Sequence, residues 1–282
     1  MKMMKMTVND ALILAKETLF NVPDRDVDAV WIVCAVTGIN RNSLHFEKDK
    51  ELTEKQILTL NAILERRKTR EPLQYILGFV PFYNIILNTD ARALIPRDET
   101  ALLVEKALIR IKRNFYKTVL DIGTGSGAIA IAVKKNAPDV LVTAVDISEN
   151  ALSLAKENAN ENETEIEFIK SDLFENLQNR KFDCILSNPP YIPTKDMEKL
   201  EKELSFEPKN ALDGGSDGLD FYRDIIEEAK EHLTKGGLIM FEIGFDQADA
   251  VRTLLSKKGF TDNYVLQDYS KLDRIVLAFY EG

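Results

Sequence analysis

The sequence is poor in the residues that build disulfide frameworks and metal sites. Its 282 residues include only two cysteines and two histidines, and neither His45 nor His232 has a partner at metal-ligand spacing. A disulfide scaffold and a zinc site are therefore excluded, and no metal is expected. We interpret Cys34, in a helix-like segment, and Cys184, in a strand-like one, as core residues in a reducing compartment.

Long apolar runs are also missing. No run reaches the roughly 18 apolar residues of a transmembrane helix, so we expect no membrane contact. The N-terminus, Met1-Lys2-Met3-Met4-Lys5-Met6, is basic, but the apolar stretch of a signal peptide does not follow it. These two observations predict a cytoplasmic protein.

The chain lacks a net positive charge, because 37 Lys and Arg residues are outnumbered by 46 Asp and Glu residues; the formal net charge is −9 and the pI is near 5.0. Extended nucleic acid needs a positive surface, so we expect no direct nucleic-acid partner. One basic cluster stands out, Arg66-Arg67-Lys68 with Arg70, and we interpret it as a solvated helix end.

Three segments differ in pattern, and we predict them as domains. Residues 1–75 are helical in pattern, with capping signals at Thr7 and Thr53, and predict a small helical bundle. Its size and near-neutral charge make this bundle a candidate for substrate docking. Residues 76–97 are aromatic and β-branched and predict a β-hairpin linker turning at Asn84. In residues 98–282, strands and helices alternate, which predicts an α/β domain with a mostly parallel sheet.

The predicted strands of this domain end in an antiparallel pair, because only a few residues join the last two. The strand-like runs are 117–123, 140–147, 166–172, 182–188, 237–244, 263–269 and 274–280, and the helical runs between them include 128–136, 149–160, 219–233 and 247–258.

A glycine-rich loop follows the first of these strands in "LDIGTGSGAIAIA", which begins at Leu120. Such glycines let the backbone turn sharply and approach a ligand, and Asp146 ends the next strand, where a ribose-binding carboxylate belongs. This pattern fits NAD loosely. Asp121, two residues before the first glycine, and the antiparallel strand pair instead resemble S-adenosylmethionine methyltransferases. The expected cofactor-binding residues are Gly123, Thr124, Gly125, Ser126, Gly127, Asp146, Asp172, Leu173 and Asn188.

The fourth strand stops at Ser187 and is followed by Asn188-Pro189-Pro190-Tyr191. Ligands of such sheets bind at the carboxyl ends of the strands, so we expect this tetrad to face the cofactor. The Asn188 side-chain oxygen and the Pro189 carbonyl could each accept one hydrogen of a planar NH₂ group, while the Tyr191 ring covers it. All four residues are predicted to be catalytic and substrate-binding, by orientation and without a strong base.

The chain resembles the HemK/PrmC glutamine-N5 methyltransferases. Besides the glycine loop and the tetrad, the shared segments are "EPLQYILG" (71–78), "IPRDET" (95–100), "FEPKNALDGGSDGLDFYR" (206–223) and "FEIGFDQ" (241–247). This chain differs from the family's usual pattern at Asp98, Ala101 and Leu173.

The resemblance implies a seven-stranded class I methyltransferase domain behind a small helical bundle and a hairpin. It also implies S-adenosylmethionine as cofactor and, as partner, a peptide chain release factor methylated on the glutamine of its Gly-Gly-Gln motif. Carried over, Gly123–Gly127, Asp146, Leu173 and Asn188 would hold the cofactor, and Asn188–Tyr191 would hold the glutamine.

Other functions stay open at this point. The tetrad also occurs in adenine-N6 and guanine-N2 methyltransferases, although the acidic charge opposes a nucleic-acid substrate. A module that binds S-adenosylmethionine only as a structural ligand and an NAD oxidoreductase are the remaining alternatives. We expect a monomer.

Overall fold

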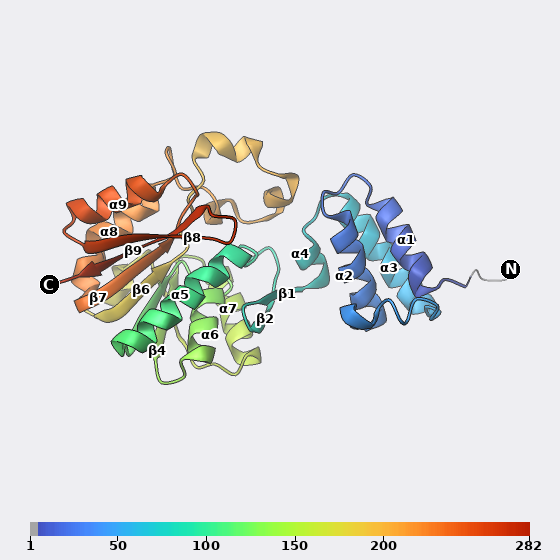
Figure 1. The fold of residues 1–282 in the computed structure, drawn as a ribbon, viewed down its shortest axis with the longest axis horizontal. Coiled ribbons are helices and arrows are strands. Elements are labelled where there is room, and N and C mark those ends of the chain that lie inside the picture. Colours follow the sequence, from blue (N-terminus) through green and yellow to red (C-terminus); the bar gives the residue numbers. More distant parts are fainter. Residues whose placement is uncertain (1–4) are drawn as a thin grey trace. The chain divides into compact units, whose positions relative to one another are not determined.

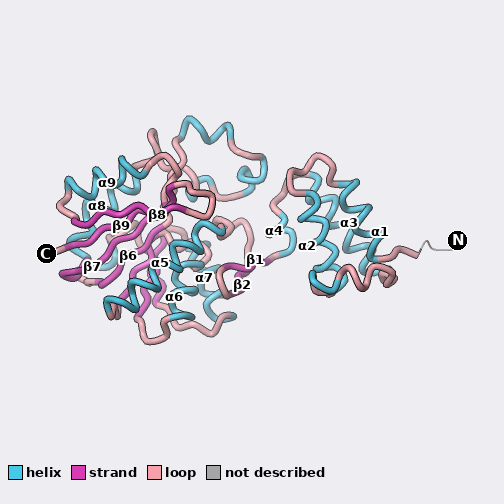
Figure 2. The backbone as a smooth tube through the Cα atoms, viewed as in Figure 1, coloured by secondary structure: helices cyan, strands magenta, loops and turns pink. Residues whose placement is uncertain are grey.

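The structure is a computed structural model that describes residues 5–282, so the start of the basic N-terminus lies outside the described residues. The chain forms two compact units. One comprises the chain up to Gly78 together with Glu201–Phe206, and the other comprises Phe79–Leu200 and Glu207–Gly282. Figures 1 and 2 show a helical first unit and a second unit built on a sheet. The domains 1–75, 76–97 and 98–282 remain a prediction.

The first unit contains the helices α1 (Val8–Thr18), α2 (Arg25–Thr37), α3 (Glu54–Lys68) and α4 (Leu73–Leu77). Thr7 and Thr53 begin α1 and α3 with capping boxes, as the sequence predicts. The hairpin prediction from residue 76 onward is wrong at its first two residues. Ile76 and Leu77 belong to α4, which ends at Gly78 in the left-handed conformation (φ 83°).

The basic cluster at the end of α3 is partly buried, so the prediction of a solvated helix end is wrong for Arg67. This side chain donates to Asp28 Oδ2 at 2.7 Å and to Glu203 Oε1 at 3.0 Å, and the residue is only 5% exposed. Arg70 donates to both Glu203 oxygens, at 2.5 and 2.6 Å. Glu203 is 136 residues from Arg67 in the sequence, so local pattern could not reveal the pairing.

The second unit starts with the predicted hairpin. Strands β1 (Phe79–Phe82) and β2 (Ile85–Asn88) pair antiparallel, and Phe82 stands opposite Ile85 across the turn at Tyr83 and Asn84. The turn therefore lies where the sequence predicts it.

The main sheet has seven strands in the order β5-β4-β3-β6-β7-β9-β8. The pairs from β5 to β7 are parallel, whereas β9 runs antiparallel to both β7 and β8. The predicted α/β fold class and its antiparallel strand pair are confirmed. The strands are β3 (Thr118–Ile122), β4 (Leu141–Asp146), β5 (Glu167–Lys170), β6 (Phe182–Ser187), β7 (Leu233–Glu242), β8 (Thr261–Gln267) and β9 (Asp273–Tyr280).

Helices cover both faces of this sheet (Figure 1), and each face has its own apolar core. Successive strand residues point to opposite faces, so Cys184 belongs to one core and Ile185 to the other. The helices are α5 (Asp98–Asn114), α6 (Ala128–Asn136) and α7 (Glu149–Glu161) toward one face, and α8 (Asp220–His232) and α9 (Ala248–Lys257) toward the other. The interpretation of Cys184 as a core residue is confirmed, since its side chain is fully buried.

The strand order places a topological switch point at β3, whose neighbours β4 and β6 lie on opposite sides. Chain connections leave β3 and β6 toward opposite faces in such sheets, which opens a crevice at the carboxyl ends of the strands. The glycine loop follows β3 and the Asn-Pro-Pro-Tyr tetrad follows β6, so the fold brings the two sequence motifs to this crevice.

Candidate active site

A pocket of about 630 Å³ occupies the switch point of the second unit. It is lined by residues that directly follow β3, β4, β5 and β6, and by the segments before α5 and at the start of α8. Its volume suits a drug-sized or nucleoside-sized ligand. The predicted residues that line it are Gly123, Gly125, Asp146, Asp172, Leu173, Asn188, Pro189 and Pro190.

The glycine loop is held from below by Asp121. Its Oδ2 accepts a hydrogen bond from Thr124 Oγ1 at 2.6 Å and another from the Ala130 N–H at 3.2 Å. The residue is fully buried, and burial raises the pKa of its carboxyl to about 7. Asp121 therefore joins the loop to the first turn of α6, beneath the pocket floor.

The glycines of the loop have different tasks. A Cβ on Gly123 (φ 69°) would meet no heavy atom within 4 Å, so its missing side chain leaves open space in the pocket. A Cβ on Gly127 (φ 85°) would lie 2.9 Å from the Ile131 side chain and 3.2 Å from Ala155 Cβ, so this glycine permits close packing of helices. Thr124, Ser126 and Gly127 support the loop without lining the pocket.

Asp146, at the end of β4, fixes the loop from the other side. Its Oδ2 accepts from the Gly125 N–H and its Oδ1 from the Ser148 N–H, both at 2.9 Å. Burial nevertheless raises the pKa of this carboxyl, because the charged form is poorly solvated. Each oxygen keeps a second lone pair, so the carboxylate can still accept hydrogen bonds from two ligand hydroxyls.

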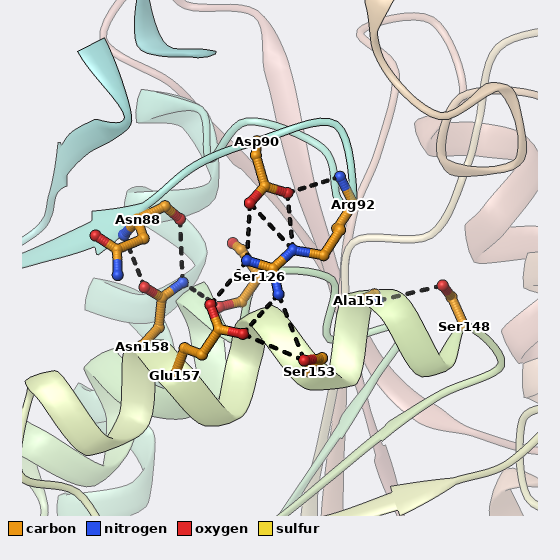
Figure 3. Close-up of polar contacts among 9 residues, drawn as sticks. All are labelled: Asn88, Asp90, Arg92, Ser126, Ser148, Ala151, Ser153, Glu157 and Asn158. Carbon is orange, nitrogen blue, oxygen red and sulfur yellow. Dashed lines mark hydrogen bonds and ion pairs between the residues drawn. The ribbon is translucent and has the colours of Figure 1, made fainter. Parts of the chain in front are cut away.

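A segment after the hairpin, Ala91–Leu94, forms another wall of the pocket and is fastened to α7 (Figure 3). Arg92 donates to both Glu157 oxygens, at 2.6 and 2.7 Å, and to Asp90. The fully buried Asn158 donates to Ser126 and exchanges hydrogen bonds with the Asn88 backbone. The sequence did not predict this wall, because the wall is connected to the glycine loop only through side chains of α7.

The tetrad after β6 is locked by a glycine-containing loop. A Cβ on Gly214 would lie 2.7 Å from the Pro190 carbonyl oxygen, and one on Gly218 would lie 2.3 Å from that of Tyr191, so only glycine allows this approach. The Tyr191 carbonyl also accepts from Gln247 Nε2 at 3.0 Å. Tyr191 does not line the pocket; it packs beside the core under α8, and burial raises its pKa to about 12.

The chain after the tetrad contacts the pocket again near residue 207, where Glu207 anchors it to the segment before α5. This buried carboxylate accepts from the Ile95 N–H at 2.9 Å and pairs with Arg97. Pro208, Asn210 and Ala211 consequently join the pocket wall, as do Phe221 and Asp224 from the first turns of α8. These five residues lie in or beside the segment 206–223. The family resemblance includes this segment, but the chemistry of its residues did not predict a role in the site.

Among residues 5–282, no group of three or more His, Cys, Asp or Glu side chains is placed to hold a metal ion. Over the same residues, no helix has both the length and the apolar content needed to cross a bilayer.

Two family models match the chain: the PrmC N-terminal domain over residues 10–78 and the Methyltransferase small domain over residues 98–219. The release factor glutamine methyltransferase of Geobacter sulfurreducens is 42% identical over 90% of this chain and 89% of its own length. The release factor glutamine methyltransferase of Caulobacter vibrioides is 37% identical over 98% of this chain and 97% of its own length. The chain belongs to the release factor glutamine methyltransferase family. It is therefore an S-adenosylmethionine-dependent methyltransferase, and the predicted family is confirmed.

Solved structures agree with this methyltransferase fold. The ribosomal protein L11 methylase of Lactobacillus delbrueckii subsp. bulgaricus is 25% identical, with a TM-score of 0.50 over 68% of this chain and 83% of that one. A T. thermophilus 16S rRNA N2 methyltransferase, solved with AdoMet and guanosine, is 17% identical, with a TM-score of 0.52 over 72% and 49%. The second likeness concerns the fold alone.

The pocket of this methyltransferase fits the cofactor of its family. Asp146 offers carboxylate lone pairs for ribose hydroxyls, and the side chain of Leu173 and the neighbouring Ile147 offer apolar surface beside it. The space left open at Gly123 admits a ligand close to the backbone and to the N-terminal end of α6. The NAD alternative loses its support, because the family model and the curated relatives are those of methyltransferases.

Proposed function

We propose that this methyltransferase transfers a methyl group to the side-chain nitrogen of the glutamine in the Gly-Gly-Gln motif of peptide chain release factors. The observation that carries the proposal is that Asn188, Pro189 and Pro190 line the same pocket that fits the cofactor. Relatives over nearly the whole chain are named release factor glutamine methyltransferases, and their similarity supports the same substrate.

In this proposal, two oxygens hold the glutamine amide. The Asn188 Oδ1 and the Pro189 carbonyl each accept one N–H, and two successive prolines keep the backbone that positions them extended. We assign the Tyr191 ring to the face of the amide plane, although this residue lies outside the pocket lining and packs beside the core. Held in this way, the nitrogen has its lone pair directed toward the cofactor, and orientation alone lowers the barrier by several kcal/mol.

S-adenosylmethionine, when bound, supplies an electrophilic methyl carbon. We assign its ribose to Asp146 and its adenine to the Asp172–Leu173 wall, and its remaining contacts to Gly123–Gly127 and Asn188. Neither of the two histidines of the chain lines the pocket. The chain then needs no dedicated base, because the methylated amide nitrogen is acidic enough to release its proton to water.

The test uses purified protein, a purified release factor and S-adenosylmethionine labelled in its methyl group. We expect label on the Gly-Gly-Gln peptide, located by mass spectrometry, and none on a factor whose loop glutamine is replaced by alanine. Replacing Asn188 with alanine should lower kcat by about 100-fold, the usual effect of removing one positioned hydrogen-bonding group. Label that persists on the glutamine-free factor would contradict the proposed substrate.

An RNA substrate is the second arm of the same assay. Methylation of rRNA or tRNA without release factor would favour the nucleic-acid alternative, which the net charge of −9 opposes. We further propose that the enzyme acts as a monomer in the cytoplasm, where translation takes place, and that its helical unit docks the release factor. Removing residues 1–78 should then raise KM for the factor more than KM for the cofactor.

A further inference from the structure

The proposed role of Asn188 requires its side-chain amide to face the substrate with oxygen and not with nitrogen. The two ends of an asparagine amide have nearly the same shape, so packing alone does not choose between them. A group on the inner side of Asn188 must therefore distinguish donor from acceptor. The role of this group rests on the proposed function of Asn188.

Thr100 and Glu242 occupy this inner side. Asn188 Nδ2 donates to Thr100 Oγ1 at 3.0 Å, and Thr100 Oγ1 donates to Glu242 Oε2 at 2.7 Å. Thr100 lies in the first turn of α5 and Glu242 ends β7, and both residues are buried. Neither lines the pocket, so the reaction as described above leaves both unused.

The direction of this chain of hydrogen bonds follows from proton counting. A threonine hydroxyl has one hydrogen, and an ionised carboxylate can only accept. Once Thr100 gives its hydrogen to Glu242, its oxygen can only accept from Asn188, which must present its NH₂ group inward. We propose that Thr100 and Glu242 are positioning residues that fix the Asn188 amide with Oδ1 toward the glutamine substrate.

The surroundings of Glu242 are consistent with this task. It is 1% exposed, and the groups around it are Glu99 from α5, Arg274 from β9, Tyr191 from the tetrad and Tyr222 from α8. Burial raises the pKa of its carboxyl to about 7, against the lowering effects of the Thr100 hydrogen bond, of Arg274 and of the Asn188 amide. A protonated Glu242 could donate to Thr100, which would then donate to Asn188 and turn the amide around.

The first test is Thr100→Val, which keeps the shape and removes the hydroxyl. We expect kcat for release-factor methylation to fall roughly fivefold to tenfold, the equivalent of one lost hydrogen bond, with the Kd for S-adenosylmethionine unchanged. Thr100→Ser keeps a hydroxyl and should stay within about twofold of wild type. Retained cofactor binding shows that the valine variant is folded.

Thr143→Val is the matched control. Thr143 on β4 is also buried and also donates to a glutamate, Glu167 Oε2 at 3.1 Å, but it does not line the pocket or contact Asn188. We expect this variant to lose stability without losing kcat. A Thr100→Val enzyme as active as Thr143→Val would overturn the proposal.

A second readout reports the amide orientation itself. A release factor with glutamate in place of the loop glutamine presents a carboxylate, which two fixed oxygens repel. The measured quantity is the affinity of the enzyme for the glutamate factor divided by its affinity for the glutamine factor. If Asn188 can turn its NH₂ outward in Thr100→Val, this ratio should be roughly fivefold higher for the variant than for wild type. An unchanged ratio of the two affinities counts against the assignment, since a merely structural defect would weaken both alike.

The pH profile tests Glu242. At saturating cofactor, kcat/KM of wild type should decline below about pH 7, where the carboxyl gains a proton. Glu242→Gln cannot titrate and should show no such decline, and a variant that keeps it would overturn the role of Glu242. A wild-type enzyme without transfer to release factor refutes the proposed function instead, so the two failures are distinguishable.

Discussion

Gly123 and Gly127 lie in one loop, yet we expect alanine to damage a different property at each position. Both have positive φ, 69° and 85°. Left-handed backbone costs an alanine about 1–2 kcal/mol, so the two variants share this loss of stability. The surroundings of the new methyl group then separate them.

At Gly127, the methyl group would lie 2.9 Å from Ile131 Cδ1 and 3.3 Å from Ala155 Cα. Forcing a methyl into packed surroundings costs a further 1–3 kcal/mol, so the free energy of unfolding should fall by about 2–5 kcal/mol in total. At Gly123 there is no such neighbour, and the methyl group would stand in the pocket. Cofactor affinity should fall at least tenfold there, or about 1.4 kcal/mol.

Urea unfolding and calorimetric titration with S-adenosylmethionine measure the two quantities on the same samples. We expect Gly127→Ala to have the lower urea midpoint at an unchanged slope, and a cofactor Kd within about threefold of wild type where it is folded. Gly123→Ala should have the higher urea midpoint of the two variants and the weaker cofactor binding. The reasoning is refuted if Gly123→Ala binds the cofactor as tightly as wild type, or if it is the less stable of the pair.

Three further perturbations act away from the substrate. Burial raises the pKa of Asp121 from 3.8 to about 7, so the folded state binds its proton more tightly than the unfolded state does. The free energy of unfolding should therefore fall by about 4 kcal/mol as pH rises through this window. Asp121→Asn should remove this pH dependence, as measured by urea unfolding at several pH values. Arg67→Met leaves Asp28 buried without its 2.7 Å partner, which should lower the free energy of unfolding by about 3–5 kcal/mol, with partial recovery in a double variant that also carries Asp28→Leu. Arg92→Ala releases the pocket wall from α7 and should raise the cofactor Kd about fivefold in binding titrations, with little loss of stability because the pair is half-exposed.

Each of these has an outcome that would contradict it. An Asp121→Asn protein with the same pH slope as wild type would mean that another group, such as Glu242, accounts for it. A double variant no more stable than Arg67→Met would show that the charge left on Asp28 is not the cause. Unchanged cofactor binding in Arg92→Ala would mean that the wall keeps its place without the Glu157 pair.

Local and periodic features of the chain could be predicted from the sequence. The capping boxes at Thr7 and Thr53 and the turn at Asn84 depend on residues within a few positions of one another. The alternation of strands and helices dictates a parallel sheet, and such a sheet gathers the ends of its strands at one edge. For that reason Gly123 and Asn188 could be assigned to one site before the fold was known.

The remaining parts of the site depend on contacts between distant segments. Arg92 reaches α7, Glu207 holds the segment before α5, and Thr100 meets Glu242 across 142 residues of sequence. A buried arginine and a buried glutamate look the same in a sequence as exposed ones, because burial and partner choice are set by how elements pack. The sequence by itself determined the fold class, the cofactor loop and the tetrad, since each depends on local conformation and strand order. Only the tertiary structure decided which polar groups support them, because a hydrogen bond exists only where packing brings its donor and acceptor together.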